Sequence, residues 1–245
     1  MMKKQIIKKA ILSTSITLMG LGAVSSFNSD TSLSSNIHAA QFQGQNQANE
    51  LKNYYSQTPE IFSNKKLTQV AEGSDKGKIY VDIQRSWGAF INVAGGESWG
   101  NINNLRNKQV DVFGIKDKPT SKYWWAYTEY FTGGVTPAAN PSAPVYPINV
   151  TVKKNAIVKN SFDIKAFETR KDKITLKELD FQIRKALINN NNLYNNGQNK
   201  GTVQITTKDN KVFTFDLSKK LENERANIYV DGKNIATIVA DIKIG

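Results

Sequence analysis

The segment formed by residues 171–194 constrains the fold of this 245-residue chain more than any other. Thr175 and Glu178 have the spacing of a capping box, which predicts a helix that begins at Leu176. Apolar residues then recur at helical spacing and form one stripe: Leu176, Leu179, Ile183, Ala186 and Leu187. Because asparagine favours turns and caps, the asparagines at 189–192 are expected to end the helix at Ile188. The segment therefore predicts an amphipathic helix that covers a sheet.

The same helix carries a pair of opposite charges. Asp180 precedes Arg184 by four residues, which is the favourable order for an ion pair on a helix. We interpret this pair as structural support for the helix and not as catalytic or ligand-binding groups.

The segment also follows a long gapped pattern, carried by Lys171, Ile174, Leu179, Asp180, Arg184, Leu187, Leu193 and Tyr194. This pattern resembles the C-terminal signature of the staphylococcal and streptococcal superantigen toxins and of the staphylococcal superantigen-like proteins. Residues 131–136 resemble the Gly-Gly-aliphatic-Thr turn that ends the first domain of that family, although Thr132 stands where the family often has tyrosine. Residues 216–221 and the closing strand are similar to the equivalent region of the superantigen-like proteins. The resemblance covers residues 46–245.

The resemblance implies an α+β chain with an N-terminal OB-fold β-barrel and a C-terminal β-grasp domain, in which a helix packs on a mixed sheet. The residue patterns agree with this order, because short strands precede a proline-rich stretch and a helix with a hairpin follows it. Four of the six prolines lie at 137–147, which predicts the domain linker. We therefore place the barrel at 61–136 and the β-grasp domain at 148–245.

Alternating apolar residues and intervening turn residues predict the individual strands. In the first half they are expected at 78–84, 89–93, 109–116 and 123–131, the last ending at two glycines. In the second half they are expected at 148–153, 157–163, 203–207, 212–217 and 235–244.

Residues 1–40 have the pattern of a secretory signal peptide. Four lysines precede an apolar run at 10–24 that is too short to form a stable membrane anchor, and cleavage is expected after Ala39 or Ala40. Residues 41–60 are predicted to form a polar leader, disordered to residue 49, and a short helix at Glu50–Tyr55. The mature protein is therefore expected to be secreted and extracellular, without membrane insertion.

Composition limits the chemistry of the mature protein. His38 is the only histidine and the chain has no cysteine, so neither residue type remains after residue 40. This excludes Ser-His and Cys-His nucleophiles and ordinary zinc sites. Neither a P-loop nor an EF-hand is present, although a carboxylate-only hydrolase or a calcium site stays open on composition alone. We predict no catalytic residues, no metal site, no cofactor and no enzymatic activity.

The charge indicates acidic partners. The chain has 33 basic and 21 acidic residues, and 29 and 20 remain after residue 40. Such a surface favours nucleic acid, sialylated glycans, acidic receptor ectodomains or anionic lipid, whereas dispersed lysines can also serve solubility alone. The lysines stand in ones and twos, which argues against a nucleic-acid-binding tail.

Aromatic residues form the first candidate binding site: Tyr123, Trp124, Trp125 and Tyr127. In a continuous strand, Trp124 and Trp125 would point to opposite faces, so one of them should be exposed unless a loop covers it. Exposed tryptophans are typical anchors of protein interfaces. In the alternative, both are buried between the barrel and the N-terminal helix.

The second candidate site is the segment of residues 219–225, in which Arg225 is the proposed glycan-binding residue. Some superantigen-like proteins bind sialylated glycans through an arginine in a similar position, commonly followed by methionine. Arg225 matches the arginine and Ala226 does not match the methionine. A guanidinium suits a carboxylated sugar, and the alternative is a solvated arginine in a loop.

The resemblance implies a secreted immune-evasion protein that binds a host innate-immune protein or a leukocyte receptor, for example on neutrophils, without catalysis. Alternatives are a sialylated-glycan-binding protein, a true superantigen that bridges MHC class II and the T-cell receptor, and an OB-fold nucleic-acid-binding protein. The lack of cysteine, and hence of the enterotoxin disulfide loop, favours the superantigen-like branch, and the helix signature disfavours nucleic acid. The host partner and the oligomeric state are left open.

Overall fold

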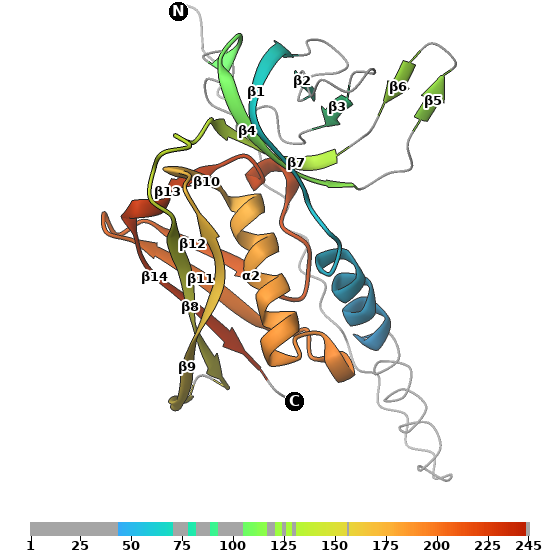
Figure 1. Cartoon of the computed structure of the whole chain (residues 1–245). Helices are drawn as coiled ribbons and strands as arrows, with labels where there is room; N and C mark the ends of the chain where they lie inside the picture. The colour runs from blue at the N-terminus through green and yellow to red at the C-terminus, as the bar shows by residue number, and fades with distance from the viewer. Residues whose placement is uncertain are drawn as a thin grey trace, which may run out of the picture. The chain divides into compact units, whose positions relative to one another are not determined.

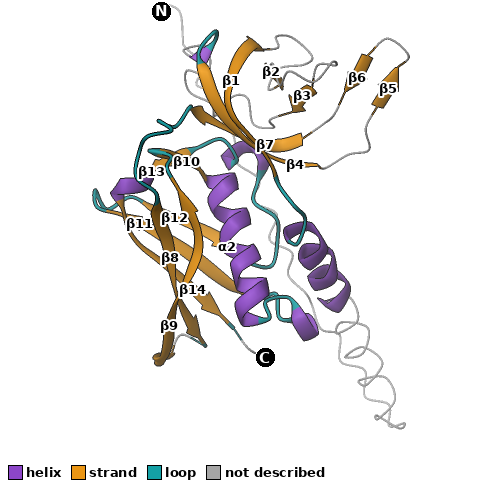
Figure 2. Ribbon diagram, in the orientation of Figure 1, coloured by secondary structure: helices purple, strands orange, loops and turns teal. Residues whose placement is uncertain are grey.

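The computed structural model of the chain describes residues 44–70, 78–81, 89–92, 105–116, 121–123, 126–128, 131–155 and 157–243. These ranges hold an N-terminal helix, a first antiparallel sheet and a second, mixed sheet with one long helix (Figures 1 and 2). The α+β fold class expected from the sequence is confirmed. The predicted signal segment, residues 1–40, lies outside the described residues.

The N-terminal helix covers residues 44–55 in the described part of the chain. The sequence predicted disorder as far as residue 49, and this was wrong for residues 44–49. Ala48 is fully buried and extends the stripe formed by Leu51 and Tyr55, which are also buried. Packing of such an apolar face against the core supplies most of the stability of a helix in a protein.

The first sheet has the strand order β3-β2-β1-β4-β7, and each neighbouring pair is antiparallel. Its strands are β1 (Glu60–Val70), β2 (Lys78–Val81), β3 (Ala89–Asn92), β4 (Gln109–Lys116) and β7 (Phe131–Pro137). The predicted strand at 109–116 is confirmed, and β2 and β3 lie within predicted ranges. Among the described residues no strand pairing joins β3 to β7, so the expected closed barrel is not found in the described pairings.

The aromatic segment was predicted as one strand at 123–131, and the structure corrects this. β5 (Ser121–Tyr123) and β6 (Ala126–Thr128) form a separate antiparallel pair in which Tyr123 stands opposite Ala126. The alternation of side chains along one continuous strand therefore does not apply across this segment.

The two glycines were predicted to form a turn, but they lie inside β7. A Cβ atom on Gly133 would meet the carbonyl oxygen of Phe113 at 1.9 Å, and one on Gly134 would meet Oγ1 of Thr175 at 2.4 Å. Next to them, the backbone N–H of Val135 donates to Oδ1 of Asn227 at 2.7 Å. These positions are glycine because β7 passes very close to β4 and to the start of the long helix, and not because the chain turns.

The second sheet has the order β12-β11-β14-β8-β9, in which β14 and β8 are parallel and the other pairs antiparallel. Its strands are β8 (Tyr146–Lys154), β9 (Ile157–Thr169), β11 (Gly201–Thr207), β12 (Val212–Asp216) and β14 (Ile235–Ile242). β9 runs six residues beyond its predicted end at 163. A ribbon of β10 (Lys173–Thr175) and β13 (Tyr229–Asp231) was not predicted. Residues 138–145 connect β7 to β8 without regular structure.

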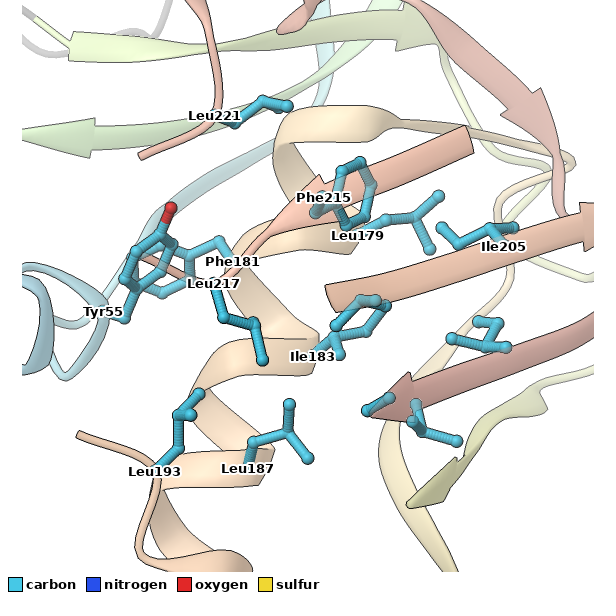
Figure 3. Close-up of a cluster of buried hydrophobic side chains, with 14 of the residues drawn as sticks. Tyr55, Leu179, Phe181, Ile183, Leu187, Leu193, Ile205, Phe215, Leu217 and Leu221 are labelled. Carbon is cyan, nitrogen blue, oxygen red and sulfur yellow. The ribbon is translucent and has the colours of Figure 1, made fainter. Parts of the chain in front are cut away.

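The helix α2 (Leu176–Asn191) begins where the sequence predicts. Oγ1 of Thr175 accepts a hydrogen bond from the backbone N–H of Glu178 at 3.2 Å, as expected of an N-cap. The helix ends three residues later than Ile188, because only Asn192 adopts the left-handed conformation, with φ of 56°. The predicted stripe is buried, and Figure 3 shows Leu179, Ile183 and Leu187 among side chains of the sheet. Burial of each such side chain stabilises the fold by about 1.5–3 kcal/mol.

The charged pair on α2 is structural, but it is also completely buried. The side chain of Asp180 is 0% exposed and that of Arg184 is 1% exposed, with Nε and Oδ1 2.7 Å apart. The remaining donors of Arg184 reach the hydroxyl of Tyr194 at 2.7 Å and the carbonyl oxygens of Leu217 and Asp216 at 3.1 and 3.0 Å. Burial raises the pKa of Tyr194 to about 12, so its hydroxyl stays protonated. A buried charge is tolerated only when it is satisfied in this way.

Candidate glycan-binding surface

Arg225 lies at one edge of the second sheet. It ends the short 3-10 helix η4 (Asn223–Arg225), which follows β12 along the chain. Among the described strands β12 pairs only with β11, so its other side is a sheet edge with backbone groups directed outward. We call Thr214, Lys219, Glu222 and Arg225 the Arg225 surface.

Contacts with the protein orient the guanidinium of Arg225. Nη2 donates to the carbonyl oxygen of Thr214 at 2.9 Å, and Nη1 donates to Oε2 of Glu222 at 3.1 Å. The guanidinium carbon lies 5.7 Å from the centre of the Phe215 ring. The side chain is still 32% exposed, so it is held against the strand edge with part of its donor set facing solvent. The group is therefore pre-oriented, unlike a solvated arginine on a long flexible loop.

Glu222 connects the two cations of the surface. Its Oε1 lies 2.6 Å from Nζ of Lys219, while Oε2 receives Arg225. The hydrogen bond from Lys219 is the main cause that lowers the pKa of Glu222 to about 2, and the same contact raises the pKa of Lys219. At neutral pH two cations and one anion of the Arg225 surface therefore meet at Glu222.

The backbone next to Arg225 explains why the chain places it here. The N–H of Arg225 donates to the carbonyl oxygen of Glu222 at 3.1 Å, which forms the tight turn of η4. The carbonyl oxygen of Ala226 accepts the N–H of Lys177 at 3.2 Å, and Asn227 holds β7. Ala226 is buried, so the position where the resemblance expects methionine serves packing and adds no exposed side chain.

The candidate segment 219–225 contains both Arg225 and Glu222, but the sequence does not indicate the contact with Thr214. The carbonyl group of Thr214 belongs to β12, eleven residues before Arg225. No local sequence pattern predicts its hydrogen bond with Arg225. The signal for Glu222 was present, because an acid three residues before an arginine can pair with it across a helical turn.

The aromatic candidates are only partly described. Tyr123 lies on β5 and Tyr127 on β6, where Tyr127 stands opposite Lys122. Trp124 and Trp125 lie outside the described residues. The proposed role of these four residues stays a prediction.

The described ranges contain no group of three or more His, Cys, Asp or Glu side chains that could hold a metal ion. None of the helices in the same ranges is long and apolar enough to cross a membrane.

Comparison with known proteins identifies the family. Residues 147–242 match the model of the staphylococcal/streptococcal toxin β-grasp domain. Superantigen-like protein 13 of Staphylococcus aureus (strain Newman) is 46% identical over 232 residues, which cover 94% of this chain and 93% of that protein. A solved S. aureus superantigen-like protein in complex with sialyl-Lewis X superimposes with a TM-score of 0.65 at 27% identity, over 81% of this chain and 99% of the other.

A second solved superantigen-like protein from S. aureus, in complex with 3-N-acetylneuraminyl-N-acetyllactosamine, gives the same TM-score of 0.65 at 28% identity. It covers 81% of this chain and 99% of its own. With a near full-length relative at 46% identity and the toxin β-grasp domain in its second half, the chain belongs to the staphylococcal superantigen-like protein family.

Proposed function

We propose that this protein is a secreted, non-catalytic immune-evasion protein that binds a host innate-immune glycoprotein or leukocyte receptor, and that the Arg225 surface recognises a sialylated glycan on that partner. The observation that carries the proposal is the orientation of Arg225 at the edge of β12, with about a third of its side chain exposed. Two structural neighbours in complex with sialylated glycans support it.

The chemistry of the surface suits a sialylated sugar. A guanidinium binds a carboxylate through charge-assisted, often paired, hydrogen bonds. In an antiparallel strand the N–H and C=O of one residue point to the same side. Because the carbonyl of Thr214 points outward to Arg225, the N–H of Thr214 points outward too and offers a donor for sugar oxygens. Glu222 prevents a pure cation patch and favours a ligand that also has hydroxyl donors.

Binding of the mature protein to immobilised sialyl-Lewis X tests the proposal. Arg225→Ala removes the charged donor, and hydrogen bonds to charged groups contribute about 1.5–3 kcal/mol, so affinity should fall roughly tenfold to a hundredfold. Arg106→Ala changes an exposed arginine outside the Arg225 surface and should leave affinity unchanged.

Leukocytes give the second measurement. Binding to neutrophils should fall after sialidase treatment and after Arg225→Ala, by similar factors. Undiminished binding after sialidase would remove the glycan from the proposal and leave a direct protein receptor.

A further inference from the structure

The second sheet opens between two neighbouring strands, β8 and β14. These strands are parallel, and their pairing begins only where Val239 lies beside Thr151. Before that point, residues 146–150 of β8 pair with β9 on their other side, and residues 235–238 of β14 pair with β11. No strand pairing in the described part of the chain joins these two segments to each other. We call the opening between them the strand fork.

Two β-bulges at the same level of the sheet account for the opening. The register between β11 and β14 skips Ala236, and the register between β8 and β9 skips Ala166. A bulge bends its strand and interrupts the regular ladder of hydrogen bonds. Because β14 is bent in this way at its start, it lies apart from the first residues of β8. The strand fork is therefore built into the sheet and does not depend on a surface loop.

The strand fork contains a pocket of about 490 Å³, which lies within the range of about 300–1,000 Å³ for small-molecule pockets. Its lining comes from both strands, from Lys208 and from the short 3-10 helix η5 (Gly232–Asn234). Ile148 and Ile238 in this lining are buried, whereas Ala236 is exposed. The pocket therefore reaches from the solvent to the edge of the core.

One exposed ammonium group at the pocket is held in place but has no counter-charge. Nζ of Lys208 donates to the carbonyl oxygen of Lys233 at 2.7 Å, and Lys208 forms no ion pair among the described residues. The nearby Asp209 pairs with Lys211 instead, and Lys233 pairs with Asp172. An ammonium group has three donors, so two donors of Lys208 remain. Because no carboxylate lines the pocket, charge complementarity favours a ligand with an acidic group.

The backbone of the strand fork restricts the rest of the ligand. Along an antiparallel strand, the N–H and C=O groups of alternate residues point to opposite sides. Since β8 and β14 each have only one partner at this level, alternate residues direct unpaired donors and acceptors into the opening. A free phosphate or carboxylate offers acceptors but no regular donors, and an apolar ligand offers neither. An extended peptide has both, at the spacing of a strand.

We propose that the strand fork binds an extended peptide segment of a protein partner, which adds a short strand in the opening and places an acidic side chain at Lys208. In such strand addition, main-chain hydrogen bonds supply the affinity and individual side chains supply the specificity. The site shares no residue with the Arg225 surface, so peptide binding does not depend on a sialylated glycan.

Two libraries of capped six-residue peptides test the proposal. Each library has one fixed position, which is aspartate in the first library and lysine in the second, and the other positions are random. Mass spectrometry of the peptides retained by the immobilised mature protein should show the aspartate library enriched about tenfold over the lysine library. Retention should be lost when alternate backbone amides of the aspartate library are N-methylated, because methylation removes the donors needed for strand pairing.

Three results of this experiment would overturn the proposal. They are the absence of retention of either library, equal retention of the aspartate and lysine libraries, and undiminished retention of the N-methylated library. The first two would remove the acidic peptide as the ligand, and the third would remove strand pairing as the mode of binding.

Variants then place the binding site. Ala236→Trp fills the strand fork from an exposed position and should abolish retention of the aspartate library. Gln204→Trp adds the same side chain at an exposed position of β11 outside the pocket and should leave retention unchanged. Thermal unfolding confirms that each variant is folded. Wild-type retention by folded Ala236→Trp would contradict the assignment.

A charge variant gives a second test that leaves the strands unaltered. Lys208→Ala should lower affinity for the retained peptides about three- to tenfold. Lys200→Ala removes an exposed lysine outside the pocket and is the matched control. Arg225→Ala should bind the peptides like the wild type, whatever its effect on glycan binding. Equal losses in Lys208→Ala and Lys200→Ala would show attraction by the overall charge of the protein and would contradict a site at Lys208.

Discussion

The hydroxyl of Tyr55 donates a hydrogen bond to Oδ2 of Asp180 at 2.7 Å, while Oδ1 of the same carboxylate holds Nε of Arg184 at 2.7 Å. One buried carboxylate therefore joins the N-terminal helix to α2. The ring of Tyr55 also lies 4.6 Å from the guanidinium carbon of Arg184. Asp180 and Arg184, two residues of the pattern at 171–194, therefore belong to a charged network inside the protein and not to its exposed surface.

Removing one member of this network should be strongly destabilising. Asp180→Asn leaves Arg184 buried without its counter-charge, and such changes cost about 3–5 kcal/mol. The loss of a few tenths of a kcal/mol that is typical of an exposed ion pair does not apply here, because both side chains are buried. Lys165→Ala, which breaks the exposed pair with Glu168, should cost less than about 1 kcal/mol. Urea unfolding measures the free energy of unfolding of both variants. Equal losses would contradict the conclusion that the buried network contributes more to stability than the exposed pair.

The apolar stripe of α2 should contribute to the stability of the fold but should not contact the host partner. Leu187→Ala or Leu179→Ala removes fully buried methyl groups and should lower the free energy of unfolding by about 2–5 kcal/mol. Val212→Ala, at a side chain that is 54% exposed, should change it much less. A Leu187→Ala protein that melts like the wild type but no longer binds host cells would show that the helix contacts the partner.

Glu222 should stabilise the protein only above acidic pH. Its pKa is lowered from 4.5 to about 2, so its stabilising contacts are complete above the unfolded value and are lost as the pH falls toward 2. Glu222→Gln should therefore be less stable than the wild type at pH 6. This difference in the free energy of unfolding should shrink as the pH falls from about 4.5 to 2. Unfolding curves across this range measure it, and a constant difference would argue against the Lys219 contact.

The close approach of β7 predicts opposite results at two glycines. Gly134→Ala places a methyl group within 2.4 Å of Oγ1 of Thr175, so it should disturb the N-cap of α2 and cost about 1–3 kcal/mol. Gly44→Ala meets nothing within 4 Å and should be neutral or stabilising by up to about 1 kcal/mol. Thermal unfolding of both variants decides between close packing and a simple need for flexibility.

The protein should engage innate immune cells or serum proteins without acting as a T-cell superantigen. Mononuclear-cell cultures should show no MHC class II-dependent expansion of particular T-cell receptor β-chains. If Trp124 or Trp125 is the interface anchor predicted from the sequence, its replacement by alanine should weaken host binding by about 2 kcal/mol or more. Strong β-chain-skewed proliferation would place the protein among the true superantigens.

Local chemistry accounts for what the sequence predicted well. The N-cap at Thr175, the strand at 109–116 and the β11–β12 hairpin each depend on residues within one turn or one alternating run. Features set by distant partners were missed. The strand at the two glycines depends on β4 and on Thr175, and the β10–β13 ribbon joins segments more than fifty residues apart.

In the candidate surface, too, local residues could be recognised in the sequence, whereas contacts with distant residues could not. Arg225 was found through resemblance, but its orientation depends on a backbone carbonyl of an edge strand that no side-chain pattern reveals. The sequence predicts that the asparagines at 189–192 end the helix, and in the structure only Asn192 has that role. Asn191 continues the helix, and its burial depends on how the following loop folds back.

Three consecutive residues, which begin with the last residue of η4, make three separate contacts. Arg225 faces the sheet edge, Ala226 receives the first turn of α2, and Asn227 fastens β7. Because these contacts come from consecutive residues, inserting or deleting one residue here would break the hydrogen bonds of this loop to α2 and β7. It would also move the guanidinium of Arg225. Exchange of the Arg225 side chain alone leaves the contacts of Ala226 and Asn227 in place, whereas a change in the length of this loop displaces all three.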